Sequence, residues 1–549
     1  MARRQEVYTV RRKRADAPAQ EETRKRAPEN EAKKPAQRKP AAGRTAEKKA
    51  PEKTAAKKTP EKKAPQKAAA KKPAAVRDDA KQKKPSASSR RRAEETVAAP
   101  VRRGRVRQDA PAQRERASRR SGKEKKKLAA QAADRRRVLA GGGGFALLLI
   151  ALLTAGFEMF GLLLAAARTP GDTQALSILA LIVPLGLLTA LVLPRFLPID
   201  RLIMAMTNFL CGVGIVILYT VSPARGARQA VFYAAGLALM LVMALIVSRL
   251  RQWRALTFLA MLLGIGALIL PLAFGSWNYG AKNWVTVPLL GSFQPSEFVK
   301  LSIILAMAYY FSAHRTVFQM MPAILFAGAC LLLLMLQRDL GTALIYYLTT
   351  LILFYAACGN LPLTVIGLGG GAGAAILGYR MFAHVKVRVA MWRNPWSDPL
   401  DKGYQIIQAL LAIGSGGLFG VGLGQGTPDK IPAYYNDFIF AVVCEQMGII
   451  FGLLVLAMYV LLIVRGVNVI MRARRSFDML LGCGVLAMLA IQTFMIVAGV
   501  IKMIPLTGVT MPFLSYGGSS LISCLAMIGI VHGISARAQE DMEEDILGA

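Results

Sequence analysis

The sequence predicts an all-α polytopic membrane protein with about twelve transmembrane helices behind a long basic tail. Of the 549 residues, 54% are hydrophobic, yet the chain carries 70 Lys and Arg against 33 Asp and Glu. A single soluble domain does not combine these two properties. Residues 1–137 alone hold 46 basic and 17 acidic residues. The charge and the hydrophobic residues therefore occupy different parts of the chain.

The tail, residues 1–137, is rich in Lys, Arg, Ala and Pro and poor in branched aliphatic and aromatic residues. This composition cannot bury enough apolar surface to offset the entropy of ordering the chain, so we expect a disordered tail. Its charge favours contact with anionic lipid or with an acidic cytoplasmic partner. Specific nucleic-acid binding is not expected, because the Lys-Ala-Pro runs contain no aromatic residue that could stack on bases.

Apolar runs follow the tail, and most have the roughly 20 residues that cross a bilayer core of about 30 Å. An acidic C-terminal tail, residues 537–549, comes after the last run. The predicted spans are 143–167, 175–197, 201–222, 229–249, 255–275, 296–313, 319–336, 340–358, 361–382, 439–465, 478–504 and 517–536.

Basic residues in short loops predict the orientation, since Lys and Arg collect on the cytoplasmic side. With the tail inside, most basic loops fall inside and both termini are cytoplasmic; the basic loop "SPARGARQA" is the exception outside. Most polar segments then emerge on the outer face. They are "WNYGAKNW", "QRDLGT", residues 384–436 and "PLTGVTMPFLSYGGSS", with Trp277, Trp284, Trp392 and Trp396. This one-sidedness predicts a single outward-facing site.

Asp437 and Glu445 stand at the head of an apolar segment, "NDFIFAVVCEQMG". A charge within hydrocarbon costs roughly 2.5–3.5 kcal/mol or more, so such residues are functional by default. Asp437 has a structural alternative as a helix N-cap worth about 1 kcal/mol. Glu445 lies two turns deeper, where a cap cannot explain it.

Two other charged pairs stand at predicted helix starts. Glu297 and Lys300 in "QPSEFVKL" are three residues apart, close enough to form a self-neutralised pair, and the alternative is contact with substrate. Asp339 in "LQRDLGTALI" adjoins Arg338, and the same structural alternative applies. The sequence alone leaves these alternatives open.

"FLSYGGSSL" lies at another helix start. Backbone N–H groups there can bind an anion, and small residues can equally let helices pack closely. Its candidate residues are Ser515, Tyr516, Gly517, Gly518 and Ser519.

Nucleotide-binding signatures are missing from the sequence. The six cysteines are widely spaced without a CxxC pair, which indicates neither a metal centre nor a disulfide framework. An enzyme acting on the outer face therefore needs a substrate that arrives already activated, and a lipid-linked one is the natural candidate.

Five ordered segments resemble the hallmark motifs of the FtsW/RodA/SpoVE family, the SEDS peptidoglycan glycosyltransferases. They are "SFQPSEFVKL", "LQRDLGTALI", "GYQIIQALLAIGSGGLFGVGLGQG", "NDFIFAVVCEQMG" and "PLTGVTMPFLSYGGSSL". The resemblance implies a ten-helix core over residues 199–536, so that two helices within 138–198 are additions. It also implies a large extracytoplasmic loop, residues 383–438.

The resemblance implies polymerisation of lipid II at the outer face of the bacterial cytoplasmic membrane, with inversion and with undecaprenyl pyrophosphate as leaving group. A class B penicillin-binding protein is the implied transpeptidase partner. The family's essential aspartate matches Asp437, which implies a general base rather than a cap. Lys386 and Arg388 in "HVKVRVAMW", or a divalent cation (Mg or Mn), would stabilise the leaving group. Trp284, Glu297, Lys300, Glu445 and residues 515–519 complete the predicted substrate contacts.

Four positions depart from the family pattern. They are Asn436 in place of Thr, Arg338 in place of Pro, Asn283 where a basic residue is common, and Gln446 where a second Glu often follows. None of them removes Asp437.

Two alternative functions are a lipid II flippase and a non-catalytic scaffold for a transpeptidase. A flippase should also carry polar residues on the inner side, and a scaffold leaves Glu297 and Glu445 unexplained. The sequence does not distinguish a role in division, elongation or sporulation.

Overall fold

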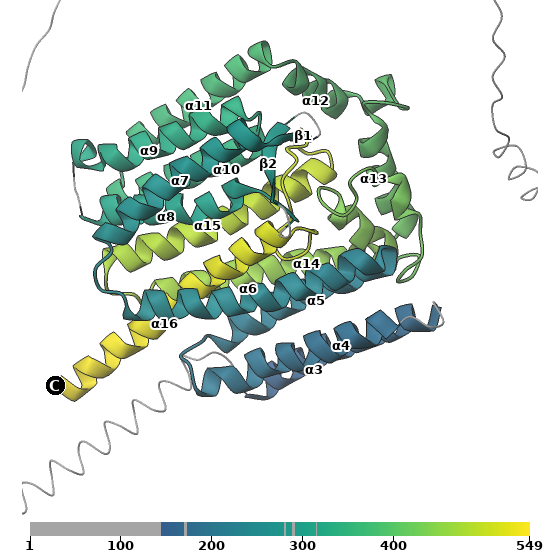
Figure 1. Cartoon of the computed structure of the whole chain (residues 1–549), viewed down its shortest axis with the longest axis horizontal. Helices are drawn as coiled ribbons and strands as arrows, with labels where there is room; N and C mark the ends of the chain where they lie inside the picture. Colours follow the sequence, from purple (N-terminus) through teal and green to yellow (C-terminus); the bar gives the residue numbers. More distant parts are fainter. Residues whose placement is uncertain (1–143, 169–172, 279–280, 288–290, 314–315, 549) are drawn as a thin grey trace, which may run out of the picture. The chain divides into compact units, whose positions relative to one another are not determined.

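The fold is taken from a computed structural model, which describes residues 144–168, 173–278, 281–287, 291–313 and 316–548. The tail predicted over residues 1–137 lies outside the described residues. Within them the secondary structure is helical, apart from a three-stranded antiparallel sheet (Figure 1).

Long helices stand at all twelve predicted spans. Eleven helices of the described residues are long and apolar enough to cross a membrane, which confirms the all-α polytopic prediction. Helix α8 is not among the eleven, because Glu297 and Lys300 near its start lower its mean hydropathy. The long helices are α3 (Gly144–Arg168), α4 (Thr173–Leu187), α5 (Arg201–Val221), α6 (Pro223–Arg249), α7 (Arg254–Phe274), α8 (Pro295–Ala313), α9 (Val317–Leu336), α10 (Leu340–Cys358), α11 (Leu361–Met381), α14 (Ile439–Ile470), α15 (Ser476–Val500) and α16 (Gly518–Gly548).

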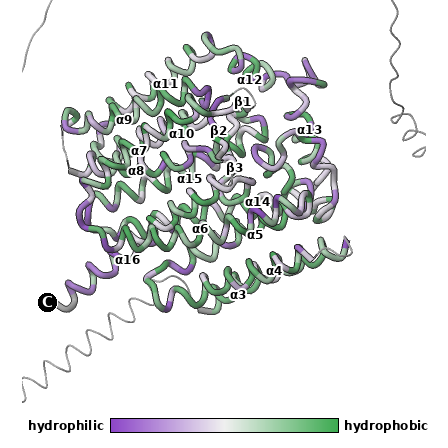
Figure 2. The backbone as a smooth tube through the Cα atoms, viewed as in Figure 1, coloured by the Kyte–Doolittle hydropathy of each residue, from purple (hydrophilic) through white to green (hydrophobic). Residues whose placement is uncertain are grey.

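The helices are hydrophobic along most of their length, and hydrophilic residues gather at helix ends and around α12 and α13 (Figure 2). Helices α3 and α4 form a hairpin against α5 and α6, and α16 lies along α6. Helix α8 packs against α7, α10 and α15. The buried core runs through these contacts. Helices α8, α10 and α15 are therefore held together over much of their length.

The predicted loop over residues 383–438 is folded. It contains α12 (Ala383–Arg393), a 3-10 turn (Pro395–Ser397) and α13 (Tyr404–Gly416). The sheet consists of β1 (Ser276–Asn278), β2 (Ala281–Val287) and β3 (Gly291–Phe293), with Val285 paired to Phe293. Strand β2 contacts the α7 and α8 helices that flank the sheet.

A glycine-rich turn after α13 inserts against the first part of α14. The backbone N–H groups of Val421 and Gly422 donate to the carbonyls of Glu445 and Gln446, at 2.9 and 3.0 Å. Helix α14 kinks at Gly448, whose φ is +85°, and a Cβ there would collide with the carbonyl of Leu418. Only glycine allows this close approach.

The residues predicted as an acidic C-terminal tail, 537–549, continue helix α16 as far as Gly548. Arg537 anchors this extension, because its Nη1 donates to Asp478 Oδ1 at 2.8 Å and its Nη2 donates to the Leu250 carbonyl at 2.6 Å. The start of α15 and the end of α6 are thus tied to the last helix.

Candidate functional site

A cavity of about 450 Å³ lies where α8 and α10 begin. Strand β2, helices α12 and α13, and the chain segments before α14 and α16 complete its walls. The structure thus brings together segments that are far apart in the sequence. The predicted site residues that line it are Trp284, Glu297, Lys300, Arg388 and Asp437.

Asp437 lies in the turn before α14. The N-cap position of α14 is Phe438, and no side chain caps it, so the structure does not show the N-cap arrangement. Burial raises the pKa of Asp437 from 3.8 to about 6; the Arg388 guanidinium opposes this rise and Asp339 adds to it. At neutral pH the group is ionised, and it is a stronger base than an ordinary aspartate.

Arg388 connects α12 to the segment before α16. Its Nη1 donates to the carbonyls of Thr507 at 2.9 Å and Leu506 at 3.3 Å. Gly508 follows with a φ of +73°, and a Cβ there would lie 3.3 Å from Arg388 Nη2 and 3.6 Å from Asp437 Oδ2. The backbone at Gly508 therefore approaches both Asp437 and Arg388 closely.

Helix α12 presents one face to the cavity, formed by His384, Val387, Arg388 and Met391. Two residues along a helix turn the side chain by about 200°. Lys386 therefore points away from the side of Arg388 and is exposed outside the cavity lining. The structure thus places Arg388 in the cavity lining and Lys386 outside it, and a leaving-group contact by Lys386 stays a prediction.

Lys402 supplies a second cation to the cavity, and the sequence analysis missed it. Its side chain is 53% exposed, and its Nζ lies 3.8 Å from Asp398 Oδ2. The only signal in the sequence is its position directly before the "GYQII" motif. Arg388 and Lys402 are thus the two cationic side chains outside the Glu297–Lys300 pair that line the cavity.

His384 is a second missed residue. Its Nε2 is buried and has no hydrogen-bond partner among the residues that the structure describes. Burial lowers the pKa of His384, and the positive charges of Arg388 and Arg338 lower it further. The ring is therefore neutral at pH 7. Nothing in the sequence distinguished it from the two other histidines.

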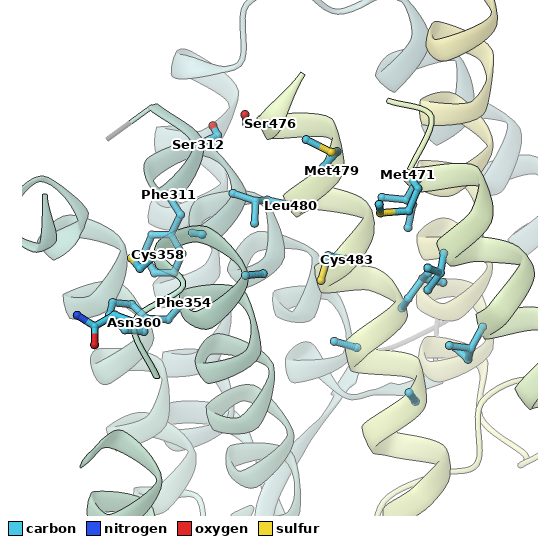
Figure 3. Close-up of a pocket in the computed structure, with 18 of the residues that line it drawn as sticks. Phe311, Ser312, Phe354, Cys358, Asn360, Met471, Ser476, Met479, Leu480 and Cys483 are labelled. Atoms are coloured by element: carbon cyan, nitrogen blue, oxygen red, sulfur yellow. The ribbon is translucent and has the colours of Figure 1, made fainter. Parts of the chain in front are cut away.

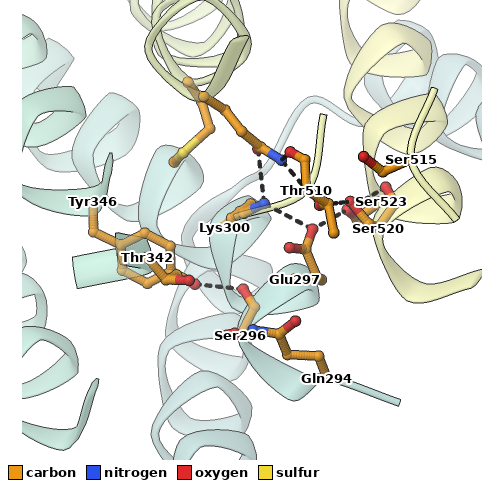
Figure 4. Close-up of polar contacts among 12 residues, drawn as sticks. Gln294, Ser296, Glu297, Lys300, Thr342, Tyr346, Thr510, Ser515, Ser520 and Ser523 are labelled. Carbon is orange, nitrogen blue, oxygen red and sulfur yellow. Dashed lines mark hydrogen bonds and ion pairs between the residues drawn. The ribbon is translucent and has the colours of Figure 1, made fainter. Parts of the chain in front are cut away.

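Glu297 and Lys300 form a buried ion pair at the floor of the cavity (Figure 4). Glu297 Oε2 accepts from Lys300 Nζ at 2.7 Å and from Ser523 Oγ at 3.1 Å. Lys300 Nζ also donates to Gln492 Oε1 at 2.9 Å, and Gln492 Nε2 donates to the Thr510 carbonyl at 2.7 Å. The pair ties α8 to α15 and α16, and it also borders the cavity.

Asp339 organises the opposite wall. Its Oδ2 accepts from Asn283 Nδ2 at 2.8 Å and from Gln294 Nε2 at 3.1 Å, and its Oδ1 accepts from the Thr342 N–H at 3.2 Å. The last bond caps the first turn of α10. Asp339 therefore joins β2 and the start of α8 to α10, and Asn283 takes part in this link.

Glu445 lies outside the cavity lining. Its Oε1 accepts from the Thr427 N–H at 2.9 Å. The neighbouring Gln446 Oε1 accepts from the Gly424 N–H at 3.0 Å and from Thr220 Oγ1 at 3.1 Å. The structure thus gives both residues a role in holding the glycine-rich turn, and substrate contact by Glu445 stays a prediction.

Residues 515–519 lie behind the Asp437 turn and outside the cavity lining. Ser515 Oγ donates to the Asn436 carbonyl at 2.6 Å, and the Tyr516 N–H donates to the Tyr435 carbonyl at 2.8 Å. The Gly517 N–H donates to Gln229 at 3.3 Å. A Cβ at Gly518 would lie 2.8 Å from the Phe232 ring, and Ser519 is buried. The backbone N–H groups of Tyr516 and Gly517, which the sequence predicted as possible anion ligands, thus donate to groups of the protein.

Arg225, in the basic loop that the sequence assigns to the outer face, braces the same turn. Its Nη1 donates to Tyr434 Oη at 2.7 Å, and its Cζ lies 4.1 Å from the centroid of the Tyr435 ring. Tyr435 also packs edge-on against Tyr516, with centroids 6.0 Å apart. Arg225, a basic residue assigned to the outer face, therefore supports the turn that carries Asp437, because its partner Tyr434 lies three residues before Asp437.

Comparisons with known proteins show which family the chain belongs to. The family model FTSW_RODA_SPOVE, described as "Cell cycle protein", matches residues 201–540. The chain belongs to the FtsW/RodA/SpoVE family. The peptidoglycan glycosyltransferase RodA of Mycobacterium tuberculosis is 32% identical over 387 residues, which cover 64% of this chain and 81% of that protein.

Two further FtsW/RodA/SpoVE comparisons extend the likeness. A probable peptidoglycan glycosyltransferase FtsW of Geobacter sulfurreducens is 35% identical over 361 residues, covering 62% of this chain and 95% of its own. A solved structure described as "Structural coordination of polymerization and crosslinking by a peptidoglycan synthase complex" is 26% identical with a TM-score of 0.52, covering 61% of this chain and 97% of that one. Helices α3 and α4 precede the family match.

A divalent cation at this site would take part of its ligands from substrate phosphate oxygens and water, as Mg²⁺ commonly does. No group of three or more His, Cys, Asp or Glu side chains that could hold a metal ion occurs among the described residues. All six cysteines are free, and four of them are buried. The positive charge that the structure places at the cavity is that of protein side chains.

Proposed function

We propose that this protein is a peptidoglycan glycosyltransferase that polymerises lipid II at the outer face of the bacterial cytoplasmic membrane, with both termini in the cytoplasm. The observation that carries this proposal is the cavity in which Asp437, with its pKa raised to about 6, lies beside Arg388. Family membership and the curated glycosyltransferase relatives support it. An outward-facing cavity receives a lipid-linked substrate from the outer leaflet.

In the proposed reaction Asp437 accepts the proton of the acceptor's N-acetylglucosamine 4-hydroxyl. The freed oxygen forms a bond to the anomeric carbon of the donor, and the bond from that carbon to the pyrophosphate oxygen breaks with inversion. Undecaprenyl pyrophosphate leaves with the electron pair. General-base help of this kind is worth about 10² to 10⁴ in rate.

Charge develops on the pyrophosphate as it leaves, and cations placed beforehand stabilise it. Arg388 and Lys402 are the proposed sources, because both line the cavity. Arg388 is fixed by its bonds to the Leu506 and Thr507 carbonyls, so it needs little reorganisation during the reaction.

We also propose a transpeptidase partner, of the class B penicillin-binding type. The likeness to a peptidoglycan synthase complex whose description couples polymerization to crosslinking supports this proposal. A polymerase working beside a crosslinking enzyme can hand over each new glycan strand directly.

Lipid II polymerisation by the purified protein tests the proposed function. Asp437→Asn should abolish glycan-strand formation while the protein still accumulates in the membrane. Asp429→Asn is the matched control, because it makes the same change at an exposed position outside the cavity. A variant Asp437→Asn with near-normal polymerisation would refute the general base, and lipid II transport without polymerisation by the wild type would favour the flippase.

A further inference from the structure

A second cavity, of about 880 Å³, lies at the other end of the same helices (Figure 3). Phe311 and Ser312 at the end of α8 line it, whereas Glu297 at the start of α8 lines the Asp437 cavity. The 14 residues from Glu297 to Phe311 advance by roughly 21 Å along a helix. The second cavity therefore belongs to the opposite face of the membrane-spanning bundle.

The second cavity extends deep between α10 and the α14–α15 pair. Its lining along α15 runs from Ser476 at the helix start to Ala490. These 14 residues also correspond to roughly 21 Å of helix. Half of a bilayer core is about 15 Å thick. The cavity is thus long enough for the acyl chain of a lipid in one leaflet.

Its walls are apolar at depth and polar at the mouth. None of the described residues that line it carries a charge. Phe354, Leu480 and Leu486 form the walls, and Ser312, Asn360 and Ser476 stand at helix ends (Figure 3). An uncharged wall does not fit a pyrophosphate or a disaccharide, which need polar partners. This distribution fits an amphipathic molecule with its head group at the mouth.

The volume suits a small ligand. The cavity offers about 880 Å³, which is within the usual size of a small-ligand site of roughly 300–1,000 Å³. A single lipid chain is an occupant of this size.

Arginine residues beside the mouth of the second cavity favour a lipid with an anionic head group. The connection between α14 and α15 contains Arg472, Arg474 and Arg475, between the lining residues Met471 and Ser476. Arg474 pairs with Asp545 and Arg475 pairs with Asp541, both through partly exposed contacts. Exposed pairs of this kind are worth only about 0–1 kcal/mol, so a phosphate can compete for these guanidinium groups.

We propose that the second cavity binds an anionic phospholipid, with an acyl chain along α15, between the end of α10 and α14, and its phosphate at the α14–α15 connection. The bound chain fills the space that the ends of α10 and α14 leave beside α15. Helices α10 and α15 also reach the Asp437 cavity, where Gln492 of α15 binds Lys300 and Thr342 of α10 lines the wall. The lipid thereby supports the packing of helices that build the other cavity.

Native mass spectrometry of the full chain, with phosphatidylglycerol added, tests the proposal. Ala487→Phe fills the cavity from α15, and Val460→Phe adds similar bulk to an exposed position on α14 outside it. We expect Ala487→Phe to lower the affinity for lipid about tenfold, equivalent to roughly 1.4 kcal/mol, and Val460→Phe to leave it unchanged. Equal retention of lipid by both variants would overturn the proposal.

A second measurement uses the wild-type protein and does not depend on a variant that folds. Cys358 and Cys483 line the cavity and are the two partly exposed cysteines of the six. Their alkylation by a maleimide should slow several-fold when phosphatidylglycerol is added, and less when phosphatidylcholine is added. Equal labelling rates with and without phosphatidylglycerol would contradict an occupied cavity, and equal protection by both lipids would contradict the phosphate site.

Discussion

At the scale of single residues, the basicity of Asp437 comes from its surroundings. The family resemblance of the sequence could identify Asp437. Its pKa, however, depends on burial, which raises it, and on Arg388 and Asp339, which lower and raise it. Those two residues are 49 and 98 positions away along the chain. Lys402 and His384 were missed for the same reason, since folding alone brings them to the cavity.

The raised pKa predicts the acid limb of the pH–rate profile. The general base must be ionised, so kcat/KM for lipid II polymerisation should fall about tenfold per pH unit below a midpoint near pH 6. Arg388→Gln removes the cation that opposes the rise, so its midpoint should move upward. A wild-type profile that stays flat down to pH 5 would contradict Asp437 as the base.

The raised pKa of Asp437 also predicts that the protein loses stability as the pH rises, although its activity increases. Because folding raises the pKa of Asp437 from 3.8 to about 6, its stabilising contribution is present below pH 4 and is lost as the pH rises through about 6. Asn at position 437 does not ionise, so the variant Asp437→Asn does not lose this stability. Above pH 7 its free energy of unfolding should exceed that of the wild type by about 1–3 kcal/mol, a range that allows for the partial exposure of Asp437. Thermal unfolding at pH 4.5 and pH 7.5 measures the difference, which should be larger at the higher pH.

At the scale of elements, the sequence predicted the helices better than the connections. Each predicted span coincides with a helix because a run of about 20 apolar residues has few alternatives in a membrane. The sequence predicted only a loop over residues 383–438, because the short helices α12 and α13 lack a run of about 20 apolar residues. In "HVKVRVA" apolar and basic residues alternate, a pattern that would place Lys386 and Arg388 on one side of a strand but separates them on a helix.

The Glu297–Lys300 pair joins three helices, and its charges should be interdependent. Lys300→Met leaves a buried carboxylate without its cation and should destabilise the protein by about 3–5 kcal/mol. Exchanging the two residues, Glu297→Lys with Lys300→Glu, should restore part of this stability. If the pair is only structural, the exchange also restores polymerisation; a stable exchanged variant without activity would show that Glu297 or Lys300 contacts substrate. Thermal unfolding and lipid II polymerisation are measured on the same preparations.

Arg225 should act through the turn that it braces. Arg225→Ala removes both its bond to Tyr434 and its stacking on Tyr435, so the turn before Asp437 loses its support. We expect kcat to fall by up to about 10²-fold, the effect of a small misplacement of a reacting group, with little change in KM. Arg228→Ala, at an exposed position on the same helix, is the control. Arg225→Lys should rescue little, because an ammonium group cannot reproduce planar stacking.

At the scale of the whole molecule, two parts of the chain precede the region that the family model matches. Residues 201–540 match the family, whereas the α3–α4 hairpin and the basic residues 1–137 precede the match. Every residue that lines the Asp437 cavity falls within the matched region. The chemistry is therefore expected to reside in the family core, and the added parts are expected to serve its placement in the cell.

The basic tail provides the last prediction. Its 46 basic residues exceed its 17 acidic ones by 29, and in the proposed orientation it faces the cytoplasmic leaflet. Each basic residue near an anionic surface is attracted by about 1 kcal/mol within a Debye length of roughly 8 Å. Deleting residues 1–130 should leave lipid II polymerisation by the purified enzyme within a few-fold of the full-length rate, because the proposed orientation has the Asp437 cavity open to the outer face. The isolated tail should bind anionic liposomes with an affinity that falls steeply with salt and should ignore neutral ones. A truncated enzyme that folds, as shown by unchanged thermal unfolding, and yet lacks polymerase activity would place the tail in the catalytic apparatus.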